Sequence, residues 1–387
     1  MTNPWHAVFL LAAAIPFIYY CIAIYSSWRF FRERPETPPA KFTPPVSILK
    51  PIRGVDPGAY ENFASFCRQD YPEYEIIFCV SGVDDPVAPL IERLQKEYPE
   101  RRIALLYGSG RAATNDKVAK LVRMVEEARY EYIVINDSDV RARPDYLRNV
   151  VAPLRDPNVG AATCFYTAIE ESSFTDSVQA IGMLSDFYAG ILVAWQLDGV
   201  KFALGPTIAT TRAHLSGFGG YAALENRTAD DLLVGRLIAE QGLEVKLLHY
   251  TVDTVADYHS MRDLIHKRLR WIVVMRHMRP WGHLGLLLTQ GLPWSLAAIA
   301  IHPRATLAAV YLGTYFALRS IMTGVIGVYG LKQRTTWRRL GLIPVWDALS
   351  FGIWVASFMR RSIRWRGADY RIGANGALAR AVGVAEP

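Results

Sequence analysis

The sequence predicts an α/β domain, built on a mainly parallel sheet, with transmembrane helices at both ends of the chain. Two observations lead to this prediction. From about residue 46 to residue 260, short apolar stretches typical of strands alternate with stretches of helical period, a pattern that produces a sheet covered by helices on both faces. On either side of this region lie long stretches with very few charges, as the core of a bilayer requires.

The chain begins with a membrane anchor, expected over residues 1–30. Residues 7–28 contain no charged side chain and are long enough to cross a bilayer, with Trp5 and Trp28 suited to the two interfaces. No lysine or arginine precedes this stretch, whereas three arginines follow it, at Arg29, Arg32 and Arg34. A cleavable signal peptide has the reverse polarity. The positive-inside rule therefore places the next region in the cytoplasm.

The α/β domain is expected over residues 31–280, and it starts with a proline-rich linker. The expected strands are Val46–Leu49, Glu75–Val80, Ile103–Tyr107, Tyr132–Ile135 and Val159–Phe165, and the expected helices are Glu61–Cys67, Val87–Tyr98 and Asn115–Ala128. In sheets of this kind, ligands bind at the carboxyl ends of the strands. Polar residues that directly follow a strand are therefore the first candidates for a site.

Membrane helices are expected again over residues 281–360. The apolar stretches are Gly282–Ile301, Ala305–Gly330 and Leu340–Phe358. If all three crossed, the arginine-rich tail, residues 361–387, would lie outside, against the positive-inside rule. Gly291 and Pro293 interrupt the first stretch, which makes it a candidate for a re-entrant or interfacial segment. Arg319 and Asp347 add a cost to simple spanning by the other two.

Charge and cysteine content exclude some classes of function. The 387 residues include 43 basic and 36 acidic side chains. Several of the basic residues gather beside the apolar segments, which favours anionic lipid headgroups over nucleic acid as a partner. The four cysteines lack a C-x-x-C spacing. We therefore expect no nucleic-acid partner, buried thiols in a reducing compartment and no zinc site.

Asp137 and Asp139 directly follow the strand expected at Tyr132–Ile135. A strand end can present both carboxylates to one cleft, where they would hold a Mg²⁺ or Mn²⁺ ion that bridges phosphate oxygens. The alternative is an acidic surface turn. The apolar strand before the pair and the further acidic pairs along the chain favour the metal site.

Asp84 and Asp85 follow the strand expected at Glu75–Val80, and they are candidates for binding a nucleotide through its base edge or ribose hydroxyls. A helix cap before Pro86 is the competing explanation for one of the two. Asp230 and Asp231 open a further apolar stretch, where one carboxylate could take a proton from an attacking hydroxyl. Acidic residues also favour helix starts, and both explanations can hold together.

Residues 261–281 have helical period, with basic side chains along one face, which is typical of a helix at a membrane surface. Within it, Arg270 can pair with a diphosphate, and Trp271 can form an apolar wall for an acceptor. Lys117, at the start of an expected helix, is a candidate phosphate ligand. His259 is kept as an acceptor-binding candidate, whereas the other histidines lack metal-ligand spacing.

With these motifs in order, the chain resembles the ceramide glucosyltransferase family, including its bacterial relatives in hopanoid lipid synthesis, from about residue 1 to residue 375. The residues that carry the resemblance are Lys50–Gly54, Asp84–Pro86, Asn115–Val118, Asn136–Asp139, Ala229–Asp231, Arg268–Trp271 and Trp365–Arg371. Lys267 stands where the family has Gln or Arg, and Asp230 replaces a more usual glutamate.

The resemblance implies a cytosolic GT-A domain, an inverting single displacement and a UDP-sugar donor. Asp84 or Asp85 would contact the nucleotide, Asp139 together with Asp137 would bind the metal, and Asp231, or less directly Asp230, would be the general base. The other residues expected to bind the donor are Lys50, Pro51, Lys117, Asp137, Arg270 and Trp271. Trp271 and His259 are expected to contact the acceptor, and the tail is expected close to the catalytic face.

The predicted function is transfer of a hexose from UDP-glucose or UDP-N-acetylglucosamine to the hydroxyl of a membrane lipid, such as ceramide or a hopanoid polyol. The expected location is the bacterial inner membrane, with the catalytic domain facing the cytoplasm. A processive polysaccharide synthase is one alternative, but it should need more membrane spans for a translocation channel. A non-catalytic lipid-binding membrane protein is another, and the intact Asp139, Asp231, Arg270 and Trp271 argue against it.

Overall fold

The computed structural model describes residues 4–33, 42–169, 173–255, 260–365, 368–373 and 376–380. Across these ranges, eight strands form one sheet in the order β3-β2-β1-β4-β7-β6-β8-β5. The strands are β1 (Val46–Pro51), β2 (Tyr74–Val80), β3 (Arg102–Tyr107), β4 (Tyr132–Ile135), β5 (Val140–Arg141), β6 (Val159–Ile169), β7 (Ile208–Thr211) and β8 (Glu244–Val255). Strands β3, β2, β1 and β4 are parallel, as are β6 and β8, while β7 and β5 run antiparallel to their neighbours. The predicted α/β fold with a mainly parallel sheet is confirmed.

The five expected strands and three expected helices are all present, with ends shifted by a few residues. Strand β6 continues beyond the expected Phe165 to Ile169. The sequence did not predict β5, β7 or β8. Both β5 and β7 are short, and β8 alternates buried and half-exposed residues along much of its length, a weaker signal than the continuous burial of β1 and β2.

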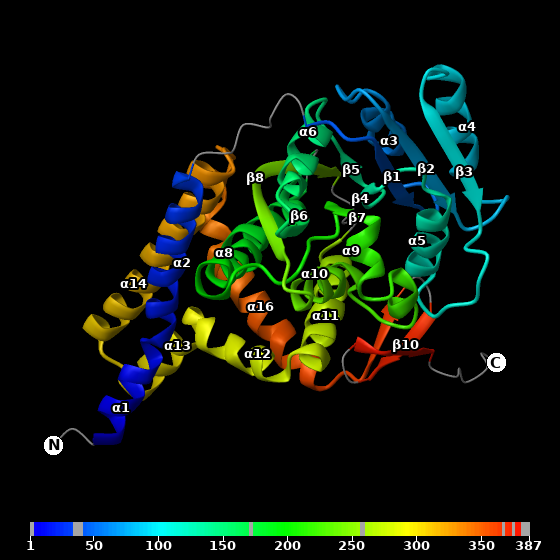
Figure 1. Cartoon of the computed structure of the whole chain (residues 1–387). Helices are drawn as coiled ribbons and strands as arrows, with labels where there is room; N and C mark the ends of the chain where they lie inside the picture. The colour runs from blue at the N-terminus through cyan, green and yellow to red at the C-terminus, as the bar shows by residue number, and fades with distance from the viewer. Residues whose placement is uncertain are drawn as a thin grey trace.

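Helices cover both faces of the sheet (Figure 1). On one face lie α3 (Ala59–Cys67), α4 (Ala88–Glu97) and α6 (Tyr146–Val151), and on the other lie α5 (Asp116–Glu127), α7 (Phe174–Gly182), α8 (Tyr188–Asp198) and α10 (Asp230–Glu240). Adjacent residues of β1 point to opposite layers, Ile48 into the first and Leu49 into the second. Short helices η1 (Ala152–Arg155), α9 (Arg212–Ser216) and η3 (Tyr221–Leu224) complete the domain.

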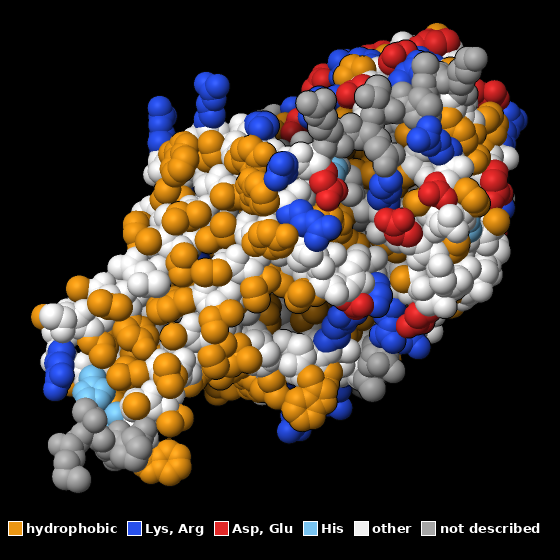
Figure 2. Space-filling model, turned by 60° about the vertical axis from the view of Figure 1, so that its left-hand side comes forward, with side chains coloured by type: hydrophobic (Ala, Val, Ile, Leu, Met, Phe, Trp, Pro, Cys, Tyr) orange, Lys and Arg blue, Asp and Glu red, His pale blue; other side chains and the backbone are white. Residues whose placement is uncertain are grey.

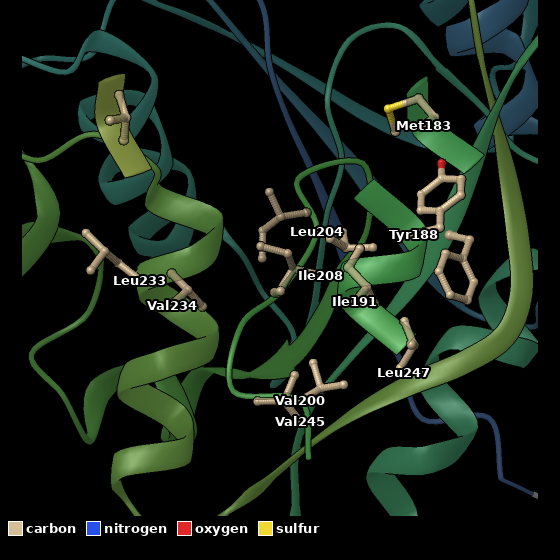
Figure 3. Close-up of a cluster of buried hydrophobic side chains, with 14 of the residues drawn as sticks. Met183, Tyr188, Ile191, Val200, Leu204, Ile208, Leu233, Val234, Val245 and Leu247 are labelled. Atoms are coloured by element: carbon tan, nitrogen blue, oxygen red, sulfur yellow. The ribbon is translucent and has the colours of Figure 1, made fainter. Parts of the chain in front are cut away.

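On the face of the sheet covered by α5, α7, α8 and α10, buried apolar side chains surround the segments of the candidate site. Figure 3 shows Leu204 and Ile208 close to Ile191 of α8, with Leu233 and Val234 on α10. All five side chains belong to one buried apolar cluster. Leu204 and Ile208 flank the loop before β7, and Leu233 and Val234 lie near the start of α10. Burial of these side chains fixes the backbone of the loop and of the helix start.

One apolar helical segment within the α/β region was not predicted. Helices α7 and α8 join through a π-helical turn, η2 (Met183–Phe187), and Phe174–Asp198 is long and apolar enough to cross a membrane. Its most apolar window is 67% buried inside the protein. The segment therefore serves as a packing layer between the sheet and the helices at the chain ends.

The chain ends form an elongated helical bundle beside the α/β domain (Figure 1). Its helices are α1 (Pro4–Ala13), α2 (Ile15–Arg32), α11 (Met261–Met278), α12 (Pro280–Gly285), η4 (Leu286–Thr289), α13 (Gly291–Ile301), α14 (Ala305–Gly324), η5 (Val325–Gly330), α15 (Thr336–Arg339), η6 (Leu340–Leu342) and α16 (Ile343–Phe358). Trp5–Arg32, Ala305–Gly330 and Thr336–Phe358 are each long and apolar enough to cross a membrane. Figure 2 shows apolar side chains over much of this end of the molecule, with acidic side chains mainly at the α/β end.

The interrupted stretch expected at Gly282–Ile301 is a broken helix. Pro280–Thr289 and Gly291–Ile301 meet at a bend of 58°. The Tyr20 hydroxyl donates to the Thr289 carbonyl (3.0 Å) and accepts from the Gly291 N–H (2.8 Å). A helix break among apolar helices leaves backbone groups without partners, and Tyr20 supplies a partner on each side of this one.

The order of contacts shows how these helices run. The His6 and His302 rings are 4.8 Å apart, so α13 ends near the start of α1. Tyr311 donates to the Leu10 carbonyl (2.7 Å), and Gly330 lies against the Phe31 ring. Helix α14 therefore returns along α1 and α2 to the α/β domain.

Helix α16 and the tail stay beside the α/β domain. Near its start, the Trp346 indole donates to Asp186 of η2 (2.7 Å), and near its end Ser357 lies 3.1 Å from the His283 ring nitrogen. The tail then forms a three-stranded sheet in the order β11-β10-β9, in which β9 is Ser362–Trp365, β10 is Ala368–Ile372 and β11 is Leu378–Arg380.

A paired glycine experiment tests the packing of α7 and α8. A Cβ at Gly182 would lie 2.4 Å from the Trp346 indole, whereas a Cβ at Gly190 would meet nothing within 4 Å. We expect Gly182→Ala to lower the free energy of unfolding by about 1–3 kcal/mol through overpacking, and Gly190→Ala to leave it unchanged or raise it. Thermal unfolding of the detergent-solubilised protein measures both, and equal midpoints would contradict the packing.

Candidate active site

Asp137 and Asp139 lie in the turn between β4 and β5, at the carboxyl end of the parallel strands. The adjacent strand β1 ends beside them. Its Lys50 is fully buried, and Nζ donates to the Asp137 backbone carbonyl (3.0 Å) and lies 3.8 Å from the Phe66 ring centroid. This position favours a supporting role for Lys50 beneath the turn over direct contact with a donor. Pro51, the last residue of β1, is buried next to it.

Lys117 joins two of the acidic pairs. Its ammonium lies 2.8 Å from Asp137 Oδ1 and 3.2 Å from Asp230 Oδ2. The side chain is held at the first turn of α5, where the Asn115 side chain caps the helix by accepting from the Val118 N–H. The sequence identified these three residues separately, and the structure places them in one cluster.

Asp231 is held against the same cluster by the backbone of Gly205. The Gly205 N–H donates to Asp231 Oδ2 (3.0 Å). A Cβ on Gly205 would lie 2.8 Å from Asp137 Oδ2 and 3.2 Å from Asp231 Oδ2, so the two carboxylates flank one backbone atom. Ala229, in the left-handed region at φ 55°, precedes Asp230 at the start of α10 and turns the chain into the helix.

Burial and mutual repulsion shift the titration of these carboxylates. Burial, then the neighbouring Asp230, raises the pKa of Asp231 to about 6, with Lys117 opposing. Burial, then Asp137 and Asp56, raises the pKa of Asp139 to about 7. Burial lowers the pKa of Lys117, but Asp137 and Asp230 outweigh it, so that this pKa lies well above its ordinary value.

Asp84 and Asp85 play different parts in the loop after β2. Asp85 is buried and accepts from the backbone N–H groups of Gly54, Ser81 and Val87 at 3.1–3.3 Å. Asp85 therefore organises this loop, although it is not the N-cap of α4, which is Val87 without a side-chain cap hydrogen bond. Asp84 is exposed beside it and is the better placed of the two to meet a ligand.

Arg270 and Trp271 are half-buried on α11. The Trp271 ring packs against Phe187 of η2, with centroids 6.3 Å apart. A Cβ on Gly376 would lie 3.4 Å from both Met278, at the end of α11, and Thr228, just before Asp230, so the end of α11 lies close to the segment that precedes α10. His259 lies outside the described residues.

Three features of the site were not identified from the sequence. Gly205 lacks a charged or aromatic signature, although the Gly-Pro pair after an apolar stretch marks a turn. Asp56, which accepts from the Ser138 hydroxyl, stands in a loop after β1 without a second acidic residue. The third is the folding of the tail into a sheet, although the tail itself was expected close to the site.

Backbone hydrogen bonds join the tail to the segment before Asp230. Thr228 N–H donates to the Gly376 carbonyl (2.9 Å), and Leu378 N–H donates to the Asn226 carbonyl (2.8 Å). From the other side, Asn115 donates to the Arg227 carbonyl (2.8 Å). The tail therefore lies beside the candidate catalytic residues.

The fold and the enzyme class are supported by comparison with solved structures and curated proteins. The mannosyltransferase PcManGT from Pyrobaculum calidifontis, solved in complex with GDP-Man and Mn2+, matches 91% of this chain and 98% of its own, with a TM-score of 0.63 at 19% identity. The chain is a glycosyltransferase with the GT-A fold.

The chain belongs to glycosyl transferase family 21, whose model matches residues 8–378. Ceramide glucosyltransferase 3 of Caenorhabditis elegans is 22% identical over 87% of this chain and 74% of its own length. Ceramide glucosyltransferase 1 of the same organism is 21% identical over 69% of this chain and 57% of its own. A ceramide glucosyltransferase of Komagataella phaffii is 32% identical over 35% of this chain and 26% of its own. The expected membership of the ceramide glucosyltransferase family is confirmed.

The place of Gly205 between two carboxylates gives a sharp test of the site. Gly205→Ala should lower turnover about 100-fold, because the added methyl displaces Asp137 or Asp231 from its position. Steady-state glycosyl transfer by the purified protein is the measurement.

Gly190→Ala is the control, since Gly190 lies on α8 outside the site and a Cβ there meets nothing within 4 Å. It should retain the wild-type rate. An active Gly205→Ala variant would show that the two carboxylates need not be held as the structure places them.

Proposed function

We propose that the protein is an inverting glycosyltransferase that moves a hexose from UDP-glucose or UDP-N-acetylglucosamine to the hydroxyl of a membrane lipid. Ceramide and a hopanoid polyol are the two acceptor types we would test first. The names of the relatives support a lipid acceptor. The observation that carries the proposal is the convergence of Asp137, Lys117, Asp230 and Asp231 around Gly205.

Asp231 is proposed as the general base. Its Oδ2 is fixed by the Gly205 N–H, and burial, together with the neighbouring Asp230, raises its pKa towards the range in which a carboxylate takes a proton effectively. It would take the proton of the lipid hydroxyl as the hydroxyl oxygen bonds to C1 of the sugar. The bond from C1 to the diphosphate breaks in the same step, and UDP leaves with the electron pair.

Lys117 and Asp230 would assist the transfer step without taking the proton themselves. The Lys117 ammonium lies against Asp137 and Asp230 and can offset negative charge where the diphosphate departs. Asp230 positions Lys117 and, through repulsion, raises the proton affinity of Asp231. Exposed Asp84 is proposed to contact the nucleotide, together with Arg270 and Trp271 on α11.

A divalent cation, Mg²⁺ or Mn²⁺, is proposed to bind at Asp139 and Asp137. In the described ranges no three ligating side chains enclose a metal ion, but Mg²⁺ commonly uses one or two carboxylates together with substrate phosphates. Asp137 and Asp56 lie close enough to Asp139 to help burial raise its pKa, and a divalent cation would offset this concentration of negative charge, so the residues fit such an ion. When bound, it would neutralise charge on the departing diphosphate.

We further propose an anchor over residues 1–30, a cytosolic GT-A domain over 31–280, membrane helices over 281–360 and a cytosolic tail over 361–387, in a bacterial inner membrane. The end of α2 carries Arg29 and Arg32, in keeping with a cytoplasmic end. Crossing by α2, by the broken α12–α13 segment and by α14, with α16 lying beside the domain, would keep the tail on the cytoplasmic side. The contacts of residues 376–378 with the site support this arrangement.

The test is UDP release by the detergent-solubilised protein with Mg²⁺ or Mn²⁺, using a panel of UDP-sugars crossed with ceramide and a hopanoid polyol. UDP release that depends on one lipid would establish the donor and the acceptor together. If no pair gave release while the folded protein bound UDP, a lipid acceptor of this kind would be excluded.

Asp231→Asn should lower lipid-dependent turnover by about 100- to 10,000-fold, because the amide cannot accept the proton. Nucleotide binding, measured by calorimetry, should be retained. Asp156→Asn, a change in an exposed turn, is the control and should keep the wild-type rate. Full activity of Asp231→Asn would remove Asp231 as the base.

The pH profile gives an independent check on Asp231. The base works in its ionised form, and its pKa is raised to about 6, so turnover should be constant well above pH 6 and fall as the pH drops through this value. Measurement of kcat between pH 4 and pH 9 tests this. A fall centred near pH 4, about the ordinary value for an aspartate, would contradict the geometry.

A further inference from the structure

Arg268 lies two residues before Arg270, and its guanidinium is held between two indole rings. Its central carbon is 4.9 Å from the Trp271 ring centroid and 5.0 Å from that of Trp346. The residue is only 8% exposed. A guanidinium can stack on aromatic faces, and the attraction increases when water is excluded. Arg268 thus connects the tryptophan of the site to a tryptophan of α16.

The edge of the same guanidinium is fixed by α7 and η2. Nε donates to Gln179 Oε1 (3.0 Å), and Nη2 donates to the Met183 sulfur (3.0 Å). Contacts at the face and at the edge together define both the position and the tilt of the guanidinium. In the described part of the chain its cation is held by two rings and these polar atoms, with no carboxylate ion pair.

The π-helical turn η2 braces both tryptophans as well. Its Asp186 accepts from the Trp346 indole N–H (2.7 Å), and its Phe187 packs against the Trp271 ring. Asp186 also pairs with Arg319 of α14 (2.9 Å). Single π-turns in helices occur often at functional sites, and this one contacts the arginine and both rings.

We propose that Arg268 is a positioning residue for lipid transfer, which holds the Trp271 ring in the orientation that lines the acceptor path. The inference rests on the proposed function, because it takes Trp271 as a wall of the acceptor site. On an interfacial helix an unrestrained tryptophan would be drawn towards the headgroup region. Stacking on Arg268, braced by Trp346 and η2, keeps the ring turned into the protein.

The chemistry of the stack predicts that lysine will not replace arginine. A lysine ammonium is a compact charge without a plane, so it cannot cover two ring faces and donate sideways to Gln179 at the same time. Charge alone would be kept in Arg268→Lys, and the geometry would be lost.

The test uses full-length protein in detergent, with the UDP-sugar and the lipid varied separately. Arg268→Gln should lower kcat/KM for the lipid at least tenfold, while the KM for the UDP-sugar and the slow hydrolysis of UDP-sugar by water stay within twofold. Arg268→Lys should have a kcat/KM for the lipid that lies between those of Arg268→Gln and the wild type. Arg262→Gln removes an exposed arginine from the same helix, and it should behave as wild type.

A double-mutant cycle with Trp271→Leu shows whether Arg268 acts through Trp271. In the Trp271→Leu background, Arg268→Gln should lower the lipid kcat/KM by less than threefold further. If the double variant lost kcat/KM for the lipid by the product of the two single-variant factors, the proposal would be overturned. Wild-type lipid kinetics in Arg268→Gln would overturn it as well. A parallel loss of nucleotide binding, hydrolysis and transfer would also overturn it, since that is the result of general structural damage.

If Arg268→Gln does not fold, wild-type lipid kinetics in Arg268→Lys would overturn the proposal.

Two further outcomes distinguish a failure of this inference from a failure of the proposed function. A wild-type protein that releases no UDP with any lipid would overturn the proposed function and this role with it. An active wild-type protein with an unaffected Arg268 variant would overturn this inference alone.

Discussion

The ion pairs of Lys117 with Asp137 and Asp230 are the interaction on which the candidate site depends. They join the turn after β4 to the start of α10, segments far apart in the chain, and they place a cation among carboxylates that would otherwise repel one another. The Gly205 backbone then fits where no side chain could. Because the Gly205 loop and the start of α10 are anchored by the buried apolar residues Leu204 and Leu233, the polar groups meet on a rigid support.

A second charged cluster connects the helical bundle to this support. Arg319 of α14 pairs with Asp347 of α16 and with Asp186 of η2. Buried ion pairs contribute little net stability, but losing one partner leaves an uncompensated charge, at a cost of about 3–5 kcal/mol. The cluster therefore specifies one arrangement of α14 and α16 against η2. Through Trp346 and Arg268, that arrangement extends to Trp271.

The sequence located elements well where the local signal was strong. Strands such as β1 and β2 are continuously apolar and buried, and the Asn115 cap marks the start of α5. The missed elements have weak local signals. Strands β5 and β7 are very short, and α7–α8 becomes a packing layer only because the bundle covers it. Asp85 shows the same limit, since one of the three backbone N–H groups that it accepts from, that of Gly54, belongs to a different loop.

The sequence alone determined the α/β class, the apolar ends and the candidate acidic pairs, because periodicity, hydropathy and residues after strands are local properties. Only the tertiary structure brought Asp137, Asp230 and Asp231 together around Gly205, and only it assigned the loop-organising part to Asp85. It also gave Arg268 its two indole partners, one of them on α16. These relations depend on which segments pack together, and packing is a property of the whole chain rather than of any window of it.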